Sequence, residues 1–124
     1  MNDKVEAFAK LHVPGAPLIL YNIWDAGSAI AVANAGAKAI ATGSWGVACS
    51  LGFKDGETLP LDSAIENLER ILSVTDLPVT IDMEAGYGAD PAEVSVSVAK
   101  AAAAGAVGFG ASSQLYRLVL KRMK

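Results

Sequence analysis

The sequence predicts an α/β fold built on a parallel sheet. Four short apolar runs alternate with segments whose apolar residues recur at helical spacing, which is typical of strands joined by helical crossovers. The joint Ala-Gly-Ala recurs at residues 35–37 and 104–106, where a helical segment gives way to a strand. A 52% apolar composition with 12 glycines and only 6% aromatic residues suits closely packed layers. We therefore expect one domain of four parallel strands with right-handed crossovers.

A helix is expected to precede the first strand, over residues 3–12. Its apolar stripe includes Val5 and Phe8 and ends at His12, the only histidine. A lone histidine at a helix end is interpreted as a C-terminal cap rather than a catalytic base. Pro14 and Pro17 then break the chain. The runs expected as strands are residues 18–23, 38–42, 77–81 and 106–110.

Three crossover helices are expected between the strands, each with its own start and stop signals. The predicted caps are Asp25 and Gly36 for the first helix, Asp62, Ser63 and Glu66 for the second, and Asp90, Pro91, Glu93 and Gly105 for the third. The predicted buried stripes are Ile65, Leu68, Ile71 and Leu72 in the second helix, and Val94, Val98, Ala101 and Ala102 in the third.

The segment over residues 47–60 is longer than ordinary connections of about 2–6 residues in α/β units. Long loops at this edge of a sheet are usually lids or binding loops. Asp55 and Gly56 lie within it and are also an ordinary turn pair. Cys49 falls in a helical turn and is interpreted as a small core residue.

Two acids, Asp82 and Glu84, follow the third strand. Carboxylates two residues apart at a strand end point to the same side of the sheet. Gly86 and Gly88 let the backbone turn sharply beside them. A solvated loop is the alternative interpretation, but the arrangement favours an oxygen-ligand site for Mg²⁺, with Mn²⁺ as the other candidate.

Charge and composition restrict the partners. The net charge is −3 and the pI about 5.0, so nothing favours a nucleic-acid surface. No apolar run approaches the roughly 20 residues that cross a bilayer. The N-terminus does not resemble a signal peptide, and Cys49 is the only cysteine. We expect a cytoplasmic protein with no membrane or nucleic-acid partner.

Four motifs together resemble the isocitrate lyase/phosphoenolpyruvate mutase superfamily, which includes 2-methylisocitrate lyases, oxaloacetate-cleaving enzymes and phosphonopyruvate enzymes. The motifs, in chain order, are NIWDAGSA (residues 22–29), TGSWGVA (42–48), LGFKDG (51–56) and DMEAGYG (82–88). The resemblance runs from residue 5 to about 108. It implies the N-terminal half of a (β/α)₈ barrel over residues 1–111, with four parallel strands and a preceding helix.

The resemblance also implies an activity and its residues. Family members make or break C–C or P–C bonds in small 2-keto or 2-hydroxy carboxylates, such as 2-methylisocitrate or oxaloacetate, and use Mg²⁺. Asp82 matches the direct metal ligand, and Glu84 the acid that binds the metal through water. Asp55 matches the catalytic aspartate of the mobile loop. The segment whose N–H groups hold a substrate carboxylate or phosphonate corresponds to Gly43, Ser44 and Trp45, although Trp45 could instead simply pack.

The match ends at about Phe109, as a frameshift, an internal deletion or a cut clone would produce. A barrel of this type takes roughly 250 residues, and the sequence has 124. Residues 112–124 read as a divergent basic helix or tail. We expect impaired activity and a homo-oligomer, because half a barrel leaves strand edges open. A noncatalytic half-barrel that self-associates, or a truncated gene product without a selected role, are the alternatives.

Overall fold

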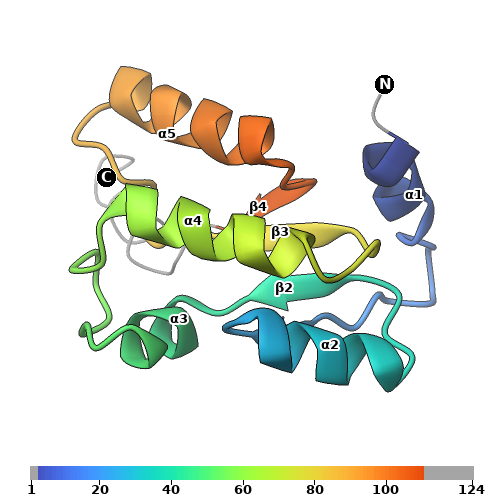
Figure 1. Cartoon of the computed structure of the whole chain (residues 1–124). Helices are drawn as coiled ribbons and strands as arrows, with labels where there is room; N and C mark the ends of the chain where they lie inside the picture. Colours follow the sequence, from blue (N-terminus) through green and yellow to red (C-terminus); the bar gives the residue numbers. More distant parts are fainter. Residues whose placement is uncertain (1–2, 111–124) are drawn as a thin grey trace.

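The computed structural model describes residues 3–110, and these contain one four-stranded parallel sheet with helices between the strands (Figure 1). The strands are β1 (Tyr21–Ile23), β2 (Ile40–Thr42), β3 (Val79–Asp82) and β4 (Gly108–Gly110). The helices are α1 (Asp3–Lys10), α2 (Ala26–Asn34), α3 (Ser44–Ser50), α4 (Leu61–Leu72) and α5 (Pro91–Ala104). The predicted α/β class and its four parallel strands are confirmed. The predicted basic tail lies outside the described residues.

The strands lie in sequence order, β1-β2-β3-β4, and α2, α4 and α5 cover one face of this sheet (Figure 1). The core between them consists of buried aliphatic residues: Ile23, Ala29, Ile40, Leu68, Ile71, Val79, Ile81, Met83, Ala101 and Ala106. Because side chains alternate along a strand, the residues between these point to the opposite face. There, Asn22, Ala41, Thr80 and Asp82 help to line a hollow of about 290 Å³.

Two crossover helices begin as the sequence predicts. Asp25 caps α2: its Oδ1 accepts the Ser28 N–H at 2.7 Å, and Ser28 Oγ accepts the Asp25 N–H at 3.1 Å. The Ser28 hydroxyl also donates to Asp25 Oδ1 at 2.8 Å, and this bond, after that from the Ser28 N–H, holds the pKa of Asp25 below its ordinary value. Asp90 caps α5 through the Glu93 N–H, and Gly105 ends that helix at φ +114°.

Replacing Asp25 with alanine is expected to lower the free energy of unfolding by about 1 kcal/mol at pH 7. The pKa of Asp25 is depressed in the folded state, so its contribution is present above the ordinary value of 3.8 and is lost as pH falls through the lower folded pKa. Urea unfolding at pH 7 and pH 3 measures the effect. Asp76→Ala, at an exposed position, is the control and should change stability by less than about 0.5 kcal/mol.

Several local predictions were wrong. Residues 44–50, expected to follow the second strand as the start of a loop with only a helical turn at Cys49, form the whole helix α3. Helix α4 begins one residue earlier than its predicted caps, with Pro60 at the N-cap and no side-chain cap hydrogen bond, because proline can precede a helix without an N–H to satisfy. In α5, Ala102 is exposed and Ser97 is buried instead. Glu93 accepts the N–H of Ala89 rather than that of the N-cap residue.

Helix α1 is shorter than predicted and has no buried residue. His12 lies just after it, and its Nδ1 is 2.9 Å from the Phe8 carbonyl oxygen, which agrees with the predicted C-terminal cap. The His12 and Phe8 rings also meet edge to face, with centroids 4.7 Å apart. The Phe8 ring reaches the start of β4, where a Cβ on Gly108 would lie 3.4 Å from Phe8 Cε1.

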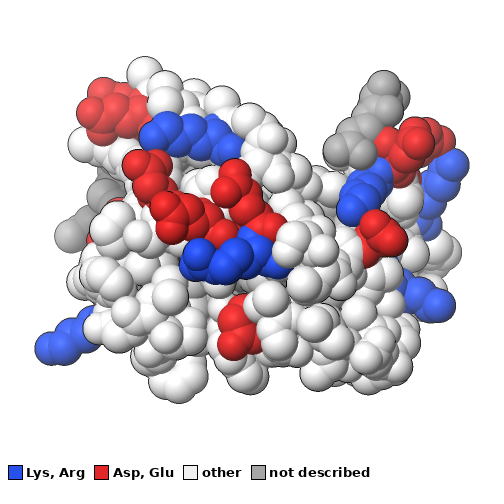
Figure 2. Space-filling view, viewed as in Figure 1, with Lys and Arg blue, Asp and Glu red and all other residues white. Residues whose placement is uncertain are grey.

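Acidic and basic side chains are intermixed over α4 and α5, and most of the remaining surface in this view carries no charge (Figure 2). Lys100 of α5 lies 3.3 Å from Asp62 of α4, and both side chains are exposed. An exposed pair of this kind contributes about 1 kcal/mol or less to stability. Within residues 3–110, no helix is long and apolar enough to cross a membrane.

Candidate active site

Asp82 stands at the carboxyl end of β3, and backbone amides hold its side chain in place. Its own N–H donates to Thr42 Oγ1 at 3.0 Å, which ties β3 to β2 beyond their last paired residues. Asp82 Oδ2 accepts the Ser44 N–H at 3.1 Å, and Oδ1 accepts the Glu84 N–H at 2.9 Å. The carboxylate is therefore fixed at the rim of the hollow on the inner face of the sheet.

Glu84 is buried, with 6% of its surface exposed, and faces the loop after α3. Its Oε1 accepts the Gly56 N–H at 3.1 Å, and its Oε2 accepts the Glu57 N–H. Burial, followed by the contact with the Asp55 carboxyl, raises the pKa of Glu84, and the two N–H groups oppose this rise. The structure thus brings Asp55 to Glu84, because the Gly56 N–H that Glu84 accepts lies 28 positions away along the chain and directly follows Asp55.

Glu57 is a residue of this site that the sequence did not predict. Its Oε1 accepts the N–H groups of Ala85 and Tyr87, at 3.0 and 2.9 Å. Glu57 thus binds the loop that carries Glu84, while Glu84 binds the loop that carries Glu57. A glutamate after a turn pair gives no local signal for such a contact, because its partners lie in another loop.

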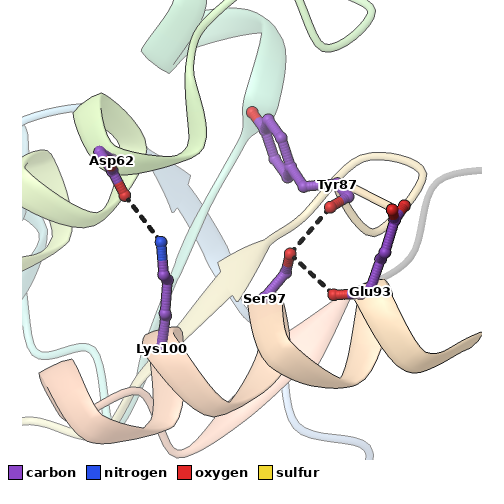
Figure 3. Close-up of polar contacts among 5 residues, drawn as sticks. All are labelled: Asp62, Tyr87, Glu93, Ser97 and Lys100. Atoms are coloured by element: carbon purple, nitrogen blue, oxygen red, sulfur yellow. Dashed lines mark hydrogen bonds and ion pairs between the residues drawn. The ribbon is translucent and has the colours of Figure 1, made fainter. Parts of the chain in front are cut away.

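The loop after β3 is anchored to α5. Ser97 Oγ lies 2.8 Å from the Tyr87 carbonyl oxygen and 3.2 Å from that of Glu93 (Figure 3). Burial, together with the charges of Glu84 and Glu57, raises the pKa of the Tyr87 phenol well above its usual range. The phenol therefore stays neutral at physiological pH beside these carboxylates.

The segment after β2 lies next to these acids. Gly43 packs against Asn22, where an added Cβ would lie 3.2 Å from Asn22 Nδ2. The Ser44 N–H is engaged by Asp82. Trp45 is 68% exposed, so it does not pack within the described residues. Cys49 is also exposed, and its interpretation as a core residue was wrong because α3 turns this face outward.

A small cavity of about 10 Å³ lies beside the acids and is the size of about one water molecule. It is lined by residues of β2, β3, α3, α4 and the two loops: Thr42, Ser44, Val47, Ala48, Leu59, Ala64, Asn67, Ile81, Asp82, Glu84 and Tyr87. Asn67 is buried and donates through Nδ2 to the Trp24 carbonyl oxygen at 2.9 Å, which holds α4 against the end of β1.

The side chains that could hold a metal are Asp82 and Glu84. Within residues 3–110, no group of three or more His, Cys, Asp or Glu side chains is placed so that it could hold a metal ion on its own. Mg²⁺ does not require one, because it keeps several waters and binds proteins through one or two carboxylates. Each Asp82 oxygen accepts one N–H from the backbone and retains a second lone pair. The donor set therefore fits Mg²⁺.

Comparison with known proteins identifies the lineage. Residues 8–111 match the family described as phosphoenolpyruvate phosphomutase. The chain belongs to this family. The predicted resemblance to the isocitrate lyase/phosphoenolpyruvate mutase superfamily is thereby confirmed, and the family and fold support a lyase or mutase type of enzyme.

Individual relatives agree with this family. The 2-methylisocitrate lyase of Escherichia coli is 31% identical, in an alignment covering 85% of this chain and 39% of the relative. An uncharacterized protein of Mycobacterium tuberculosis is 36% identical, in an alignment covering 80% of this chain and 38% of that relative. A crystal structure from Burkholderia cenocepacia, provisionally assigned as a phosphonomutase, is 52% identical, with a TM-score of 0.83 over 87% of this chain and 42% of that one.

The chain spans about two fifths of the length of these relatives. Its four strands and five described helices match the N-terminal half of the TIM barrel in the structural neighbours, as predicted.

Proposed function

We propose that this chain provides the metal-binding half of a Mg²⁺-dependent lyase that cleaves a C–C or P–C bond in a small 2-keto or 2-hydroxy carboxylate. The observation that carries the proposal is the convergence of Asp82, Glu84 and Asp55 at the carboxyl edge of a parallel sheet. Relatives support the substrate class. One is a 2-methylisocitrate lyase, and an oxaloacetate acetylhydrolase was crystallised with its product oxalate (25% identity, TM-score 0.73, over 86% of this chain and 38% of that one).

Asp82 is the proposed direct ligand of Mg²⁺, and Glu84 the acid that binds the ion through water. Mn²⁺ is the alternative ion, since it accepts the same oxygen donors. The bound ion would supply positive charge beside the substrate oxygens, where bond cleavage develops negative charge. The Ser44 N–H holds Asp82 at this rim, so the carboxylate is oriented before any ligand arrives.

Asp55 is the proposed catalytic group. Cleavage of a 2-hydroxy acid takes a proton from the hydroxyl and returns one to the carbon left behind. The Asp55 carboxyl contacts that of Glu84, and the Glu84 carboxylate accepts the N–H of Gly56, the residue after Asp55, so Asp55 is held at the strand end where the substrate would bind. Gly43, Ser44 and Trp45 are the proposed binding segment for the substrate carboxylate or phosphonate.

Release of pyruvate tests the proposal. The full chain is incubated with 2-methylisocitrate, whose C–C cleavage releases pyruvate, in about 5 mM Mg²⁺ or in EDTA. This Mg²⁺ concentration is roughly saturating for a site with few protein ligands. Turnover with Mg²⁺ and none with EDTA is expected. Equal pyruvate release in both conditions would contradict the role of the metal.

The exposed apolar surface favours self-association as a second property. Among the described residues β1 is an edge strand, and Tyr21 on it and Ile19 just before it are 57% and 68% exposed. Open strand edges with apolar side chains pair readily with a second copy.

We also place the protein in the cytoplasm, where the exposed Cys49 stays reduced.

Sedimentation velocity is expected to show a dimer or larger species for the wild type and a shift toward monomer for Ile19→Lys. A charged side chain at an exposed edge opposes pairing without entering the core. Lys38→Glu, an exposed charge change outside β1, is the control and should leave the distribution unchanged. A folded wild-type monomer at all concentrations would contradict self-association.

A further inference from the structure

Two loops that are distant in sequence bind each other through four hydrogen bonds that run in both directions. Glu84 accepts the N–H groups of Gly56 and Glu57, and Glu57 accepts those of Ala85 and Tyr87. Each glutamate therefore accepts hydrogen bonds from backbone amides of the loop that carries the other. Hydrogen bonds from backbone amides to a carboxylate are among the stronger ones in proteins.

Outside glycine, positive φ angles occur at these contacts and nowhere else among the described residues. The non-glycine residues with positive φ are Glu57 (+61°), Glu84 (+52°) and Tyr87 (+52°). This conformation is uncommon for residues with a Cβ and persists where the surroundings hold it in place. All three residues take part in the four hydrogen bonds, so the contact between the loops helps to hold this conformation.

One of the two loops is rigid and the other is exposed. The loop after β3 is fixed to α5 by Ser97, which contacts the Tyr87 carbonyl, and by the close packing of Gly86 against Val94, where an added Cβ would lie 3.0 Å from Val94 Cγ1. By contrast, every residue from 51 to 56 is exposed. The 51–57 segment is therefore the side that these bonds hold in place.

We propose that Glu57 and Glu84 form a reciprocal clamp that locks the 51–57 segment against the loop after β3, with Glu57 as a positioning residue for Asp55. Asp55 lies two residues before Glu57, and its carboxyl contacts Glu84. Opening the clamp would move Asp55 away from the acids at the strand end. The clamp itself stands on the hydrogen bonds alone, whereas its effect on turnover rests on the proposed function.

Amide hydrogen exchange of the full chain, without metal or substrate, tests the clamp. Glu57→Asp keeps the charge but shortens the side chain by one methylene, while Glu57→Gln keeps the length and loses the charge. In Glu57→Asp, exchange at Ala85 and Tyr87 is expected to rise about tenfold, as the loss of a hydrogen bond to a charged acceptor would produce. In Glu57→Gln these amides should exchange more slowly than in Glu57→Asp.

Exchange at the Gly56 amide shows whether the hydrogen bonds to Glu84 depend on those to Glu57. Its acceptor is Glu84, which the substitutions leave intact, yet a clamp predicts that Gly56 also exchanges faster in Glu57→Asp. Unchanged protection of Gly56 would overturn the proposal, because the two sets of bonds would then be independent. Equal exchange at Ala85 and Tyr87 in Glu57→Asp and Glu57→Gln would overturn it too, since the effect would then not depend on the length of the side chain.

Two controls separate local opening from unfolding. The Ile40 N–H donates to the Pro78 carbonyl oxygen at 3.0 Å in the sheet and reports global stability. Its exchange should stay at the wild-type rate in Glu57→Asp, and an equal rise at Ile40 and Gly56 would overturn the proposal of a local clamp. Glu69→Asp, an exposed glutamate on α4, should leave all these amides unchanged.

A measurement of pyruvate release distinguishes failure of this proposal from failure of the proposed function. With Mg²⁺ and 2-methylisocitrate, Glu57→Asp is expected to lower kcat about tenfold or more, because Asp55 is misplaced, whereas kcat of Glu57→Gln should be closer to wild type. If the wild type releases no pyruvate, the proposed function fails, and the exchange results still decide whether the clamp exists.

Discussion

Replacing Asp82 with asparagine is expected to abolish Mg²⁺-dependent turnover and the binding of Mg²⁺. Asparagine has nearly the same shape but no negative charge, and only one of its two terminal atoms is an oxygen. Its amide nitrogen would face either the Ser44 or the Glu84 N–H, both of which donate to Asp82. The loss in kcat should be at least about 10²–10³-fold, the effect of removing one preorganised electrostatic partner in an active site.

Calorimetric titration with Mg²⁺ and the pyruvate assay measure the two effects separately. The matched control is Asp62→Asn, because Asp62 is an exposed aspartate on α4 whose ion pair with Lys100 is open to solvent. It should retain metal binding and turnover and change stability by less than about 1 kcal/mol. Wild-type Mg²⁺ affinity and turnover in Asp82→Asn would remove Asp82 from the mechanism.

The helix starts that the sequence predicted correctly are those whose signals are local. Asp25 and Asp90 cap helices by accepting an N–H three residues ahead, and that spacing is visible in the sequence. The start of α4 was missed for the opposite reason. Pro60 caps α4 by backbone conformation alone, with φ −59° and ψ 143°, and leaves Asp62 free to reach Lys100 on the neighbouring helix.

The candidate site was only partly predictable. Asp82 and Glu84 were found because a pair of acids ends a recognisable strand, and the family resemblance then assigned their roles. The contact between Asp55 and Glu84, and the whole contribution of Glu57, depend on how two loops fold against each other. Hydrogen bonds between residues 27 to 30 positions apart leave no periodicity in the sequence to detect.

Burial was predicted better on α4 than on α5 or α3. Leu68 and Ile71 of α4 are fully buried, because helical spacing directs them onto the strands. Trp45 and Cys49 lie on α3, a helix of two turns whose outward face the sequence alone does not define. Burial at α3 is set by its neighbours rather than by its own pattern.

Gly88→Ala is expected to be strongly destabilising, by about 3 kcal/mol, the upper part of the usual range for overpacking. A Cβ at this position would lie 2.6 Å from the Val94 backbone nitrogen and 2.8 Å from Glu93 Cβ. Backbone atoms at the start of α5 cannot move aside as a flexible side chain can. The loop after β3 must therefore shift, and Glu84, which that loop carries, should lose its contact with Asp55.

Gly27→Ala is the matched control, because Gly27 lies within α2 and an added Cβ would meet only Asp25 Oδ1, at 3.6 Å. Alanine in a helix interior is favoured over glycine by about 1 kcal/mol, so Gly27→Ala should stabilise the protein while Gly88→Ala destabilises it. Urea unfolding of both variants, with Mg²⁺ titration of each, measures the contrast. Equal stability of Gly88→Ala and wild type would show that the loop tolerates a Cβ against α5, and the rigid anchoring of Glu84 would then be wrong.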